Sequence, residues 1–387
     1  MKRLLSVLVG CVAAAFMAGC TININSGSGW SGSDLKAVTN MVQSAAIPAG
    51  LKTLEVDNAF GAIRITGTDG GDFSWSQSLT VRARTDAEAQ RFATNLVCRA
   101  ELVGDRLTLV VTAPQTREPH SFQSDLEITV PKSAAVQTRD EYGATEITGL
   151  NGDVEAANKF GAVQLRNITG KVHAETSYAA LKVNHVGPAT LINQFGAIDA
   201  ENVNGPLDAE TSYAVLDASD IGGPVKLRNE FGALRVEQAG EADLKTSYAG
   251  LSAKDISGNA RLVNRFGRVN AEAVSGSVTA ETSYGAMDIS GSGGSFVCDN
   301  QFGAITVRAT SAALTNLDAR TSYATLTVRL PDSLNPAVQA HTSYADIESD
   351  FPVLMKPRGQ DPFAGLAPGT PQINLRNQHG KIRVIGE

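Results

Sequence analysis

The chain has 387 residues, of which only 6% are aromatic, and it carries 37 glycines and a formal net charge of −7. So few aromatic residues argue against a large α/β enzyme core. The negative charge excludes an electrostatic attraction to nucleic acid or to an anionic membrane surface. A chain rich in Gly, Ala, Val and Thr suits short strands separated by many turns.

The first twenty residues have the pattern of a bacterial lipoprotein signal peptide. A positive start at Lys2 and Arg3 precedes an apolar stretch that is too short to span a bilayer well. The small residues before Cys20 resemble a lipobox, so we expect residues 1–19 to be removed and Cys20 to be lipidated. Thr21, which follows, favours the outer membrane. The alternative is a secreted protein that is cut before Cys20 and carries no lipid.

Residues 20–48 are predicted to form a tether. Residues 21–32 are rich in Gly, Ser and Asn, as flexible linkers are. Within 33–46, the apolar residues recur at helical spacing behind a candidate cap at Ser33, which predicts a short docking helix. A tether that is disordered throughout is the alternative.

Residues 49–137 are predicted to form a mixed N-terminal section that caps the repeats. Alternating apolar and polar residues over 51–67 and 73–84 predict strands, and residues 86–96 have a helical pattern. Gly104-Asp105 marks the turn of a hairpin, and a last strand ends at Pro131.

Residues 138–387 contain an internal repeat marked by aromatic residues. From Tyr142 onward these aromatics recur at a nearly constant spacing of about 18 residues, which widens slightly in the last two steps. The repeat aromatics that we expect to stack are Phe160, Tyr178, Phe195, Tyr213, Phe231, Tyr248, Phe266, Tyr284, Phe302, Tyr323 and Tyr344.

The repeats alternate between two kinds, Asn-x-Phe-Gly and Thr-Ser-Tyr. The residues that begin these motifs share the phase of apolar neighbours, so we expect them to point inward and to form hydrogen-bonded ladders between coils. The ladder residues are Asn158, Asn193, Asn229, Asn264 and Asn300 in the first kind, and Thr176, Thr211, Thr246 and Thr282 in the second.

Each unit offers two short strands joined by tight turns, and neither strand buries enough surface alone. The units must therefore stack. This predicts an all-β fold, a parallel β-helix (solenoid) of about 18 residues per repeat, with the rings piled in one inner stripe at a corner. A coil of twice that length, which would stack Asn on Asn and Thr on Thr, is the alternative.

The end of the chain is predicted to close the solenoid. Residues 351–371 are rich in Pro and Gly and have the pattern of an extended loop. The final strand pattern, from Ile373 onward, would seal the last coil, because an exposed solenoid end favours aggregation.

Two cysteines remain in the mature chain, Cys98 and Cys298, and both lie in apolar strand-like stretches. Export would permit a disulfide. Because the two positions would lie many coils apart, two small buried side chains are the favoured interpretation. No Cys/His spacing indicates zinc, and no cofactor is expected.

No catalytic motif is recognisable. The histidines are scattered, and His379 replaces a repeat aromatic. Glu175, Glu210 and Glu281 recur on the outward phase, where Lys and Arg occupy equivalent positions in other repeats, so the column is expected to be a solvated face rather than a ligand site. We therefore expect that the protein is not an enzyme.

The order of motifs resembles the bacterial "putative adhesin" β-strand-repeat family of unknown function over residues 50–387. The shared elements are an opening Asn58-Ala-Phe-Gly, the strand ITVPKSAAV before the repeats, and the ending HTSYADIESDFPV followed by INLRNQHGKIRV. The resemblance implies an envelope-associated β-helix without defined catalytic residues. The strict Phe/Tyr alternation departs from the family pattern.

The leading hypothesis is an adhesin-like outer-membrane lipoprotein that binds a glycan, matrix or another envelope protein, held to the membrane by its N-terminal lipid. The first alternative is a structural or stress-related envelope component without an external ligand. The second is a polysaccharide-processing β-helix enzyme, which predicts a compact carboxylate cluster on one face.

Overall fold

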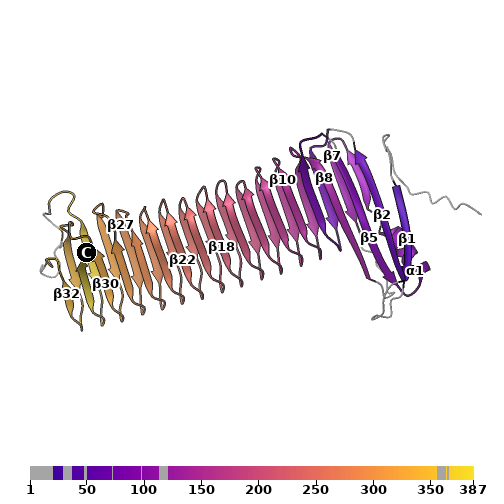
Figure 1. Cartoon of the computed structure of the whole chain (residues 1–387). Coiled ribbons are helices and arrows are strands. Elements are labelled where there is room, and N and C mark those ends of the chain that lie inside the picture. The colour runs from indigo at the N-terminus through magenta and orange to yellow at the C-terminus, as the bar shows by residue number, and fades with distance from the viewer. Residues whose placement is uncertain are drawn as a thin grey trace, which may run out of the picture.

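The computed structural model describes residues 21–28, 37–47, 50–71, 73–96, 98–112, 121–354, 363 and 366–387. They form an elongated rod of two long β-sheets, along which the chain between residues 135 and 330 advances coil by coil (Figure 1). The fold is nearly all-β, as the sequence predicts.

Each coil contributes one strand to each sheet. Thr145 pairs in parallel with Val163, which pairs in turn with Leu181. Because each partner lies a single repeat further along the chain, the structure confirms a parallel β-helix with one repeat per coil and excludes the coil of two repeats. Asn-type coils therefore stack on Thr-type coils.

The two sheets are named A and B. Sheet A contains, in spatial order, β1 (Thr21–Ser28), β2 (Ala37–Ile47), β5 (Phe73–Ala83), β8 (Ser121–Pro131), β4 (Ile63–Thr68), β10 (Thr145–Leu150), β12 (Val163–Ile168), β14 (Leu181–Val186), β16 (Ile198–Val203), β18 (Leu216–Ile221), β20 (Leu234–Ala239), β22 (Leu251–Ile256), β24 (Val269–Val274), β26 (Met287–Gly291), β28 (Ile305–Ala309), β30 (Leu326–Leu330), β34 (Ile382–Gly386) and β32 (Ile347–Ser349).

Sheet B contains, in spatial order, β6 (Arg99–Val103), β7 (Arg106–Val111), β3 (Thr53–Asn58), β9 (Ala135–Asp140), β11 (Val154–Asn158), β13 (Val172–Thr176), β15 (Ala189–Asn193), β17 (Leu207–Glu210), β19 (Val225–Arg228), β21 (Ala242–Lys245), β23 (Ala260–Val263), β25 (Val278–Thr282), β27 (Ser295–Asn300), β29 (Asn316–Arg320), β33 (Gln372–Arg376) and β31 (Ala337–His341).

The core is a set of apolar columns between the two sheets. In one coil, Val163, Leu165 and Ile168 face inward from β12, and Val172 and Ala174 face them from β13. All five side chains are buried, and the pattern repeats along the rod. Complete burial of a Val, Leu or Ile side chain contributes about 1.5–3 kcal/mol, so stacking supplies the stability that one coil lacks.

A third inward column on sheet B is polar, and its hydrogen bonds explain the two kinds of repeat. The Asn229 amide donates to Ala214 O at 2.6 Å, and its Oδ1 accepts from Gly232 N at 3.1 Å. In the next coil, Thr246 Oγ1 donates back to Gly232 O at 3.2 Å. The ladder of Asn and Thr residues therefore joins each coil to its neighbour through backbone groups.

The same bonds explain why glycine follows Phe in the Asn coils. A Cβ at Gly232 would lie 1.9 Å from Ala214 O and 2.6 Å from the Asn229 amide nitrogen. The Thr side chain is smaller than Asn, and the Thr coils accept alanine at the equivalent position, as at Ala214. Asn at the ladder position therefore requires glycine three positions later, whereas Thr also permits alanine there.

A sharp bend recurs near the end of the sheet A strands. The residues at this bend have positive φ between 52° and 57°, which brings the following residue, such as Ile168 after Asn167, back into the core. Most of these positions hold Asn or Asp, which tolerate this conformation, whereas Ala273 is an exception with φ 55°. The full set is Asn167, His185, Asn202, Asp220, Gln238, Asp255 and Ala273.

The N-terminal end of the rod is a layered cap. Helix α1 (Asp86–Asn95) begins with a capping box between Thr85 and Glu88 and packs on β5 and β2. The sheet ends there in antiparallel strands β5, β2 and β1, whereas the coils beyond are parallel. Strands β3 and β4 form a coil of their own between β7/β8 and β9/β10.

The prediction of a tether with a short helix is wrong for the described part of residues 20–48. Residues 21–28 form β1, and residues 37–47 form β2, which pairs with β5 over its whole length. The open edge of β5 offers backbone partners to every residue of β2, and that pairing outweighs the helical spacing of a few apolar residues. The signal peptide, Cys20 and Ser33 lie outside the described residues.

The prediction that the final strands seal the last coil is also wrong. Strands β33 and β34 insert between the coil of β29 and β30 and the coil of β31 and β32. The chain therefore passes the position of the next coil, forms the terminal coil, and returns to fill the gap. The last coil by position is formed by residues 337–349.

The two cysteines are free and buried, as expected for small core side chains. Burial raises the pKa of each thiol to about 12.

Candidate functional site

The repeat aromatics form one continuous stack along an edge of the rod. Consecutive rings from Phe60 to Tyr344 have centroids 4.5 to 5.2 Å apart and planes within 16° of parallel. His379 takes a place in the stack between Tyr323 and Tyr344, because its strands insert at that position. The structure thus brings together every aromatic that the repeat singles out.

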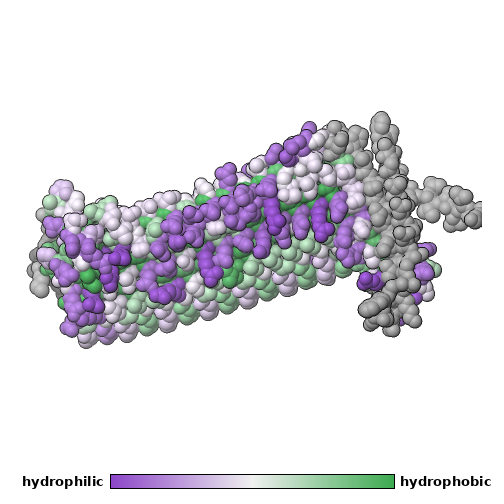
Figure 2. All heavy atoms as spheres, viewed as in Figure 1, coloured by the Kyte–Doolittle hydropathy of each residue, from purple (hydrophilic) through white to green (hydrophobic). Residues whose placement is uncertain are grey.

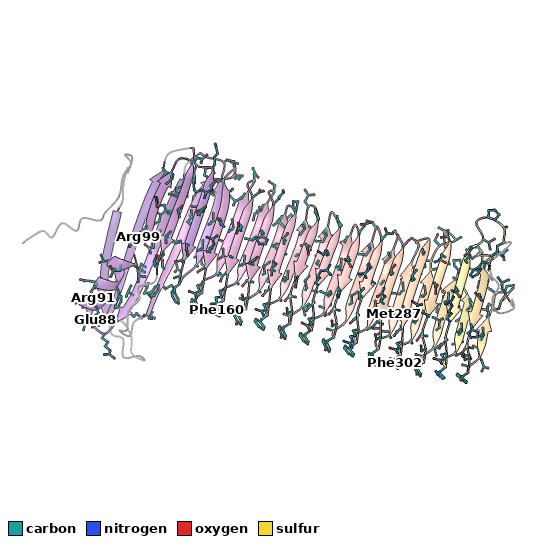
Figure 3. All side chains as sticks on the ribbon, turned by 180° about the vertical axis from the view of Figure 1, so that it is seen from behind. Glu88, Arg91, Arg99, Phe160, Met287 and Phe302 are labelled. Atoms are coloured by element: carbon teal, nitrogen blue, oxygen red, sulfur yellow. The ribbon has the colours of Figure 1, made fainter. Side chains whose placement is uncertain are left out.

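The rings do not form an inner stripe, which corrects the expected position. Phe266 is 37% exposed and Tyr323 is 54% exposed, and the two rings between them in the stack have intermediate values. Figure 3 shows Phe160 and Phe302 projecting from the same long edge of the rod. Thr176 is the last inward residue of β13, and the turn that follows carries Tyr178 outside the core.

A column of small residues runs beside the rings on the sheet A side. These residues stack coil on coil, because the backbone of each accepts a hydrogen bond from the strand start of the coil before it, as Ala197 O does from Leu181 N at 2.9 Å. They are exposed or half-exposed. The members of this alanine shoulder are Ala144, Ala162, Ala180, Ala197, Val215, Ala233, Gly250, Ala286 and Ala304.

The ring column and the alanine shoulder together define the apolar strip. Arg268 interrupts the shoulder, and its guanidinium is paired with Asp288 on the outer face of sheet A. Beyond Ala304, the same position beside the last rings holds Thr325, Lys381 and Asp346, and Lys381 is paired with Glu348. Lys159 and Arg265 lie beside the column, with their charged groups 5.2 Å and 5.1 Å from the centroids of neighbouring Phe rings. Figure 2 shows hydrophilic bands on the broad face and a paler lower edge, where the strip lies.

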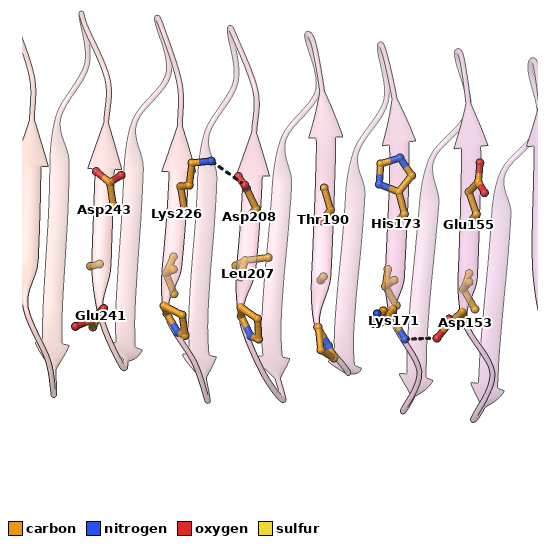
Figure 4. A pocket seen from close by; sticks show the side chains of 18 of the residues that line it. Asp153, Glu155, Lys171, His173, Thr190, Leu207, Asp208, Lys226, Glu241 and Asp243 are labelled. Atoms are coloured by element: carbon orange, nitrogen blue, oxygen red, sulfur yellow. Dashed lines mark hydrogen bonds and ion pairs between the residues drawn. The ribbon is translucent and has the colours of Figure 1, made fainter.

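A shallow furrow follows the outer face of sheet B. It has a volume of about 1180 Å³ and crosses eleven neighbouring strands, from β7 to β25. Its middle is apolar where Pro188, Pro206 and Pro224 line it in successive coils, just before the sheet B strands. The outward row of the strands bears the short side chain of Thr190 between His173 and Asp208 (Figure 4). No proline of the furrow was singled out from the sequence, because the prolines form a row only when the coils stack.

Charges of both signs border the furrow. Lys226 pairs with Asp208 at 3.0 Å, and Arg261 pairs with Asp243 at 3.5 Å, each across neighbouring strands. His173 lies 3.0 Å from Glu175 through its Nε2. These pairs are half-exposed, so each contributes little to stability and remains available to a polar ligand.

The recurring glutamates lie on the solvent face, as predicted. Glu175 and Glu210 occupy one outward column of sheet B with Ile192 between them, and Glu281 lies further along the same column. Arg228 and Lys245 interrupt the run of acids. Among the described residues, no group of three or more His, Cys, Asp or Glu side chains could hold a metal ion.

One buried carboxylate departs from the ladder. Asp140 occupies a ladder position, pairs in register with Asn58, and is 7% exposed. Its Oδ1 accepts from Glu141 N at 2.8 Å, whereas its Oδ2 and the Asn58 Oδ1 have no hydrogen-bond partner. Desolvation raises the Asp140 pKa to about 6, against the lowering effect of the backbone N–H groups.

Comparisons with known proteins identify structural neighbours only. No family model matches the chain, and no curated protein matches it. Among solved structures, a "putative adhesin" from Bacteroides fragilis is 14% identical, covers 69% of this chain and 96% of its own, and has a TM-score of 0.32. A "putative cell adhesion protein" from Clostridium sporogenes is 8% identical, with 90% and 100% covered and a TM-score of 0.19.

A third solved structure, a "putative adhesin" from Parabacteroides distasonis, is 12% identical, covers 89% of this chain and 97% of its own, and has a TM-score of 0.21. These neighbours fall in the class that the sequence resembles. At such identities and scores, the likeness assigns neither a ligand nor a location. In the part of the chain that the structure describes, no helix is long and apolar enough to cross a membrane.

Proposed function

We propose that this protein is an adhesin-like, non-enzymatic rod of the bacterial envelope, and that its furrow binds an extended polymer, such as a glycan or a peptide strand. The observation that supports it most is the continuity of the furrow. At about 4.8 Å per strand, its eleven strands extend over about 48 Å. A compact substrate would leave most of that length unused.

The composition of the furrow suits such a ligand. Apolar C–H groups of the polymer would pack on Pro188, Pro206 and Pro224, and polar groups would meet the alternating acids and bases along the furrow. Because the coils recur, a repetitive polymer can make the same contact several times, which raises the overall affinity without any strong single contact. The stacked sheets hold the surface in place before binding, which lowers the entropic cost.

The N-terminal lipid at Cys20 belongs to the same proposal. Thr21, the next residue, begins β1 at the capped end of the rod, so a lipid at Cys20 would attach the rod by that end. Firm attachment requires more than one acyl chain, and bacterial lipoproteins carry two or three. We place the protein at the outer membrane on the residue that follows Cys20.

A structural role without an external ligand is the second candidate, and the exposed apolar strip favours it. Protease treatment of intact cells separates the two roles. An adhesin that faces outward is removed, whereas a periplasmic scaffold is spared. The carboxylates described above are separated or paired with cations, so the geometry gives no support to a polysaccharide-processing enzyme.

Binding is tested with the full mature chain that carries Cys20→Ser. Glycan arrays and envelope extracts supply the ligands. Thr190→Trp places a large side chain in the furrow and should abolish binding, while Ser252→Trp on the outer face of sheet A is the matched control. Absence of binding by the parent chain, or equal binding by the Thr190 variant, would refute the proposal.

A further inference from the structure

We infer that the apolar strip is a self-association surface, through which two copies of this chain lie side by side as a homodimer. The inference does not depend on ligand binding in the furrow, because the furrow lies on the outer face of sheet B and the strip lies along a corner of the coils.

The area of the strip is that of an interface. Eleven of its rings are 37% to 74% exposed. With about 200 Å² for each aromatic side chain, they present on the order of 1000 Å² per copy. The largest apolar patch of a typical monomer is about 300–600 Å², and a stable interface needs about 800 Å² per partner. Water contact over the whole strip would therefore be unusual for a monomer.

The exposed part of each ring limits what can bind there. Within the stack, ring faces are covered by the neighbouring rings at 4.5 to 5.2 Å, so apart from the terminal Tyr344 only ring edges and the Tyr hydroxyls reach solvent. Sugar rings pack their C–H groups against the faces of aromatic rings, which are negatively polarised, and not against the edges. A glycan is thus poorly matched to the strip.

A second copy matches the strip in both period and shape. The ring column is a ridge, and the alanine shoulder beside it is a lower step of small side chains, both with the repeat of the coils. When two copies lie parallel and are related by a two-fold axis that runs along the rods, the ridge of each lies on the shoulder of the other. Such a contact is self-complementary and closed, so it stops at a dimer.

The charges predict how the dimer responds to salt. The shoulder from Ala144 to Ala304 carries a single charge, that of Arg268, which is paired with Asp288, whereas the full sequence has a formal net charge of −7. Two copies therefore repel each other over a distance that added salt shortens. We expect dimerisation to strengthen as salt is raised from about 0.02 M to about 0.5 M, and interface ion pairs would give the opposite trend.

Sedimentation velocity of the full mature chain with Cys20→Ser tests the inference between about 1 and 100 μM. The parent should be a dimer at the upper concentrations. Ala197→Glu combined with Ala233→Glu places two charges in the shoulder and should weaken the dimer at least 100-fold. Ser252→Glu with Thr306→Glu adds the same charge on the outer face of sheet A and should leave the dimer intact.

Circular dichroism should show the same β content for all three proteins. A parent that stays monomeric at 100 μM overturns the inference, and so does a shoulder variant that still dimerises. If the parent instead binds vesicles of phosphatidylethanolamine and phosphatidylglycerol as a monomer, the strip is a lipid-facing surface and the dimer is refuted. Loss of polymer binding in the Thr190 variant with an intact dimer would separate this inference from the proposed function.

Discussion

The buried carboxylate of Asp140 makes the stability of the first coils depend on pH. Asp140 replaces the Thr or Asn of the ladder, and its pKa is raised from 3.8 to about 6 by burial. A raised carboxyl pKa means that the folded state binds the proton more tightly than the unfolded state. Its contribution is therefore complete below pH 3.8 and is lost as the pH rises through about 6.

The magnitude follows from the shift. Two pKa units correspond to about 3 kcal/mol, which is the cost of the ionised side chain at pH 8, and the cost falls to about 0.5 kcal/mol at pH 4. Asp140→Asn keeps the shape of the side chain, removes the charge, and can place an amide N–H where the Asp140 Oδ2 has no partner. We expect this variant to stabilise the coil by up to about 3 kcal/mol at pH 8 and by little at pH 4.

Hydrogen exchange of the amides in 135–150 measures this locally, which matters because long repeat arrays need not unfold in one step. At pH 8 the variant should exchange up to about 100-fold more slowly than the parent at the same pH. Asp217→Asn, at a half-exposed carboxylate in a later coil, controls for the loss of one negative charge. A difference between Asp140→Asn and the parent that is the same at pH 4 and pH 8 would refute the reasoning.

Three further predictions concern single coils. Gly232→Ala places a methyl group 1.9 Å from a carbonyl oxygen of the neighbouring coil and should lower the free energy of unfolding by about 3 kcal/mol in urea denaturation. Gly250→Ala is the control, because its new methyl group has its nearest neighbour at 3.9 Å and should leave the stability unchanged or raise it. Ala273→Asn should stabilise by about 1 kcal/mol, measured as a raised midpoint, because Asn tolerates φ 55° better than Ala does. Cys98 and Cys298 should resist a thiol-disulfide reagent at pH 8 and react only after guanidinium is added, because burial keeps both thiols protonated. Rapid labelling of the folded chain would contradict this.

Much of the rod could be predicted from the sequence because stacked coils repeat a simple rule. A nearly constant spacing of the aromatics and strands of period 2 are sufficient to predict parallel coils, an inward ladder and stacked rings. The candidate site was harder to predict from the sequence. The shoulder from Ala144 to Ala304 was visible as the residue two positions after each aromatic, but nothing in its composition distinguishes an exposed alanine from a buried one.

The repeat in the sequence predicts parallel coils of equal length, because strands of period 2 bury enough surface only when they stack. That one repeat makes one coil, and so that Asn coils stack on Thr coils, follows from the strand pairing in the structure. Only the tertiary structure shows whether a given residue lies inside the coil or on its outer surface. The turn after Thr176 breaks the alternation, so Tyr178 lies outside the core although its spacing predicts the inside. It also decided where the two ends pair. β2 became a strand because β5 offered an open edge, and β33 and β34 inserted before the terminal coil, where their backbone groups find partners on both sides.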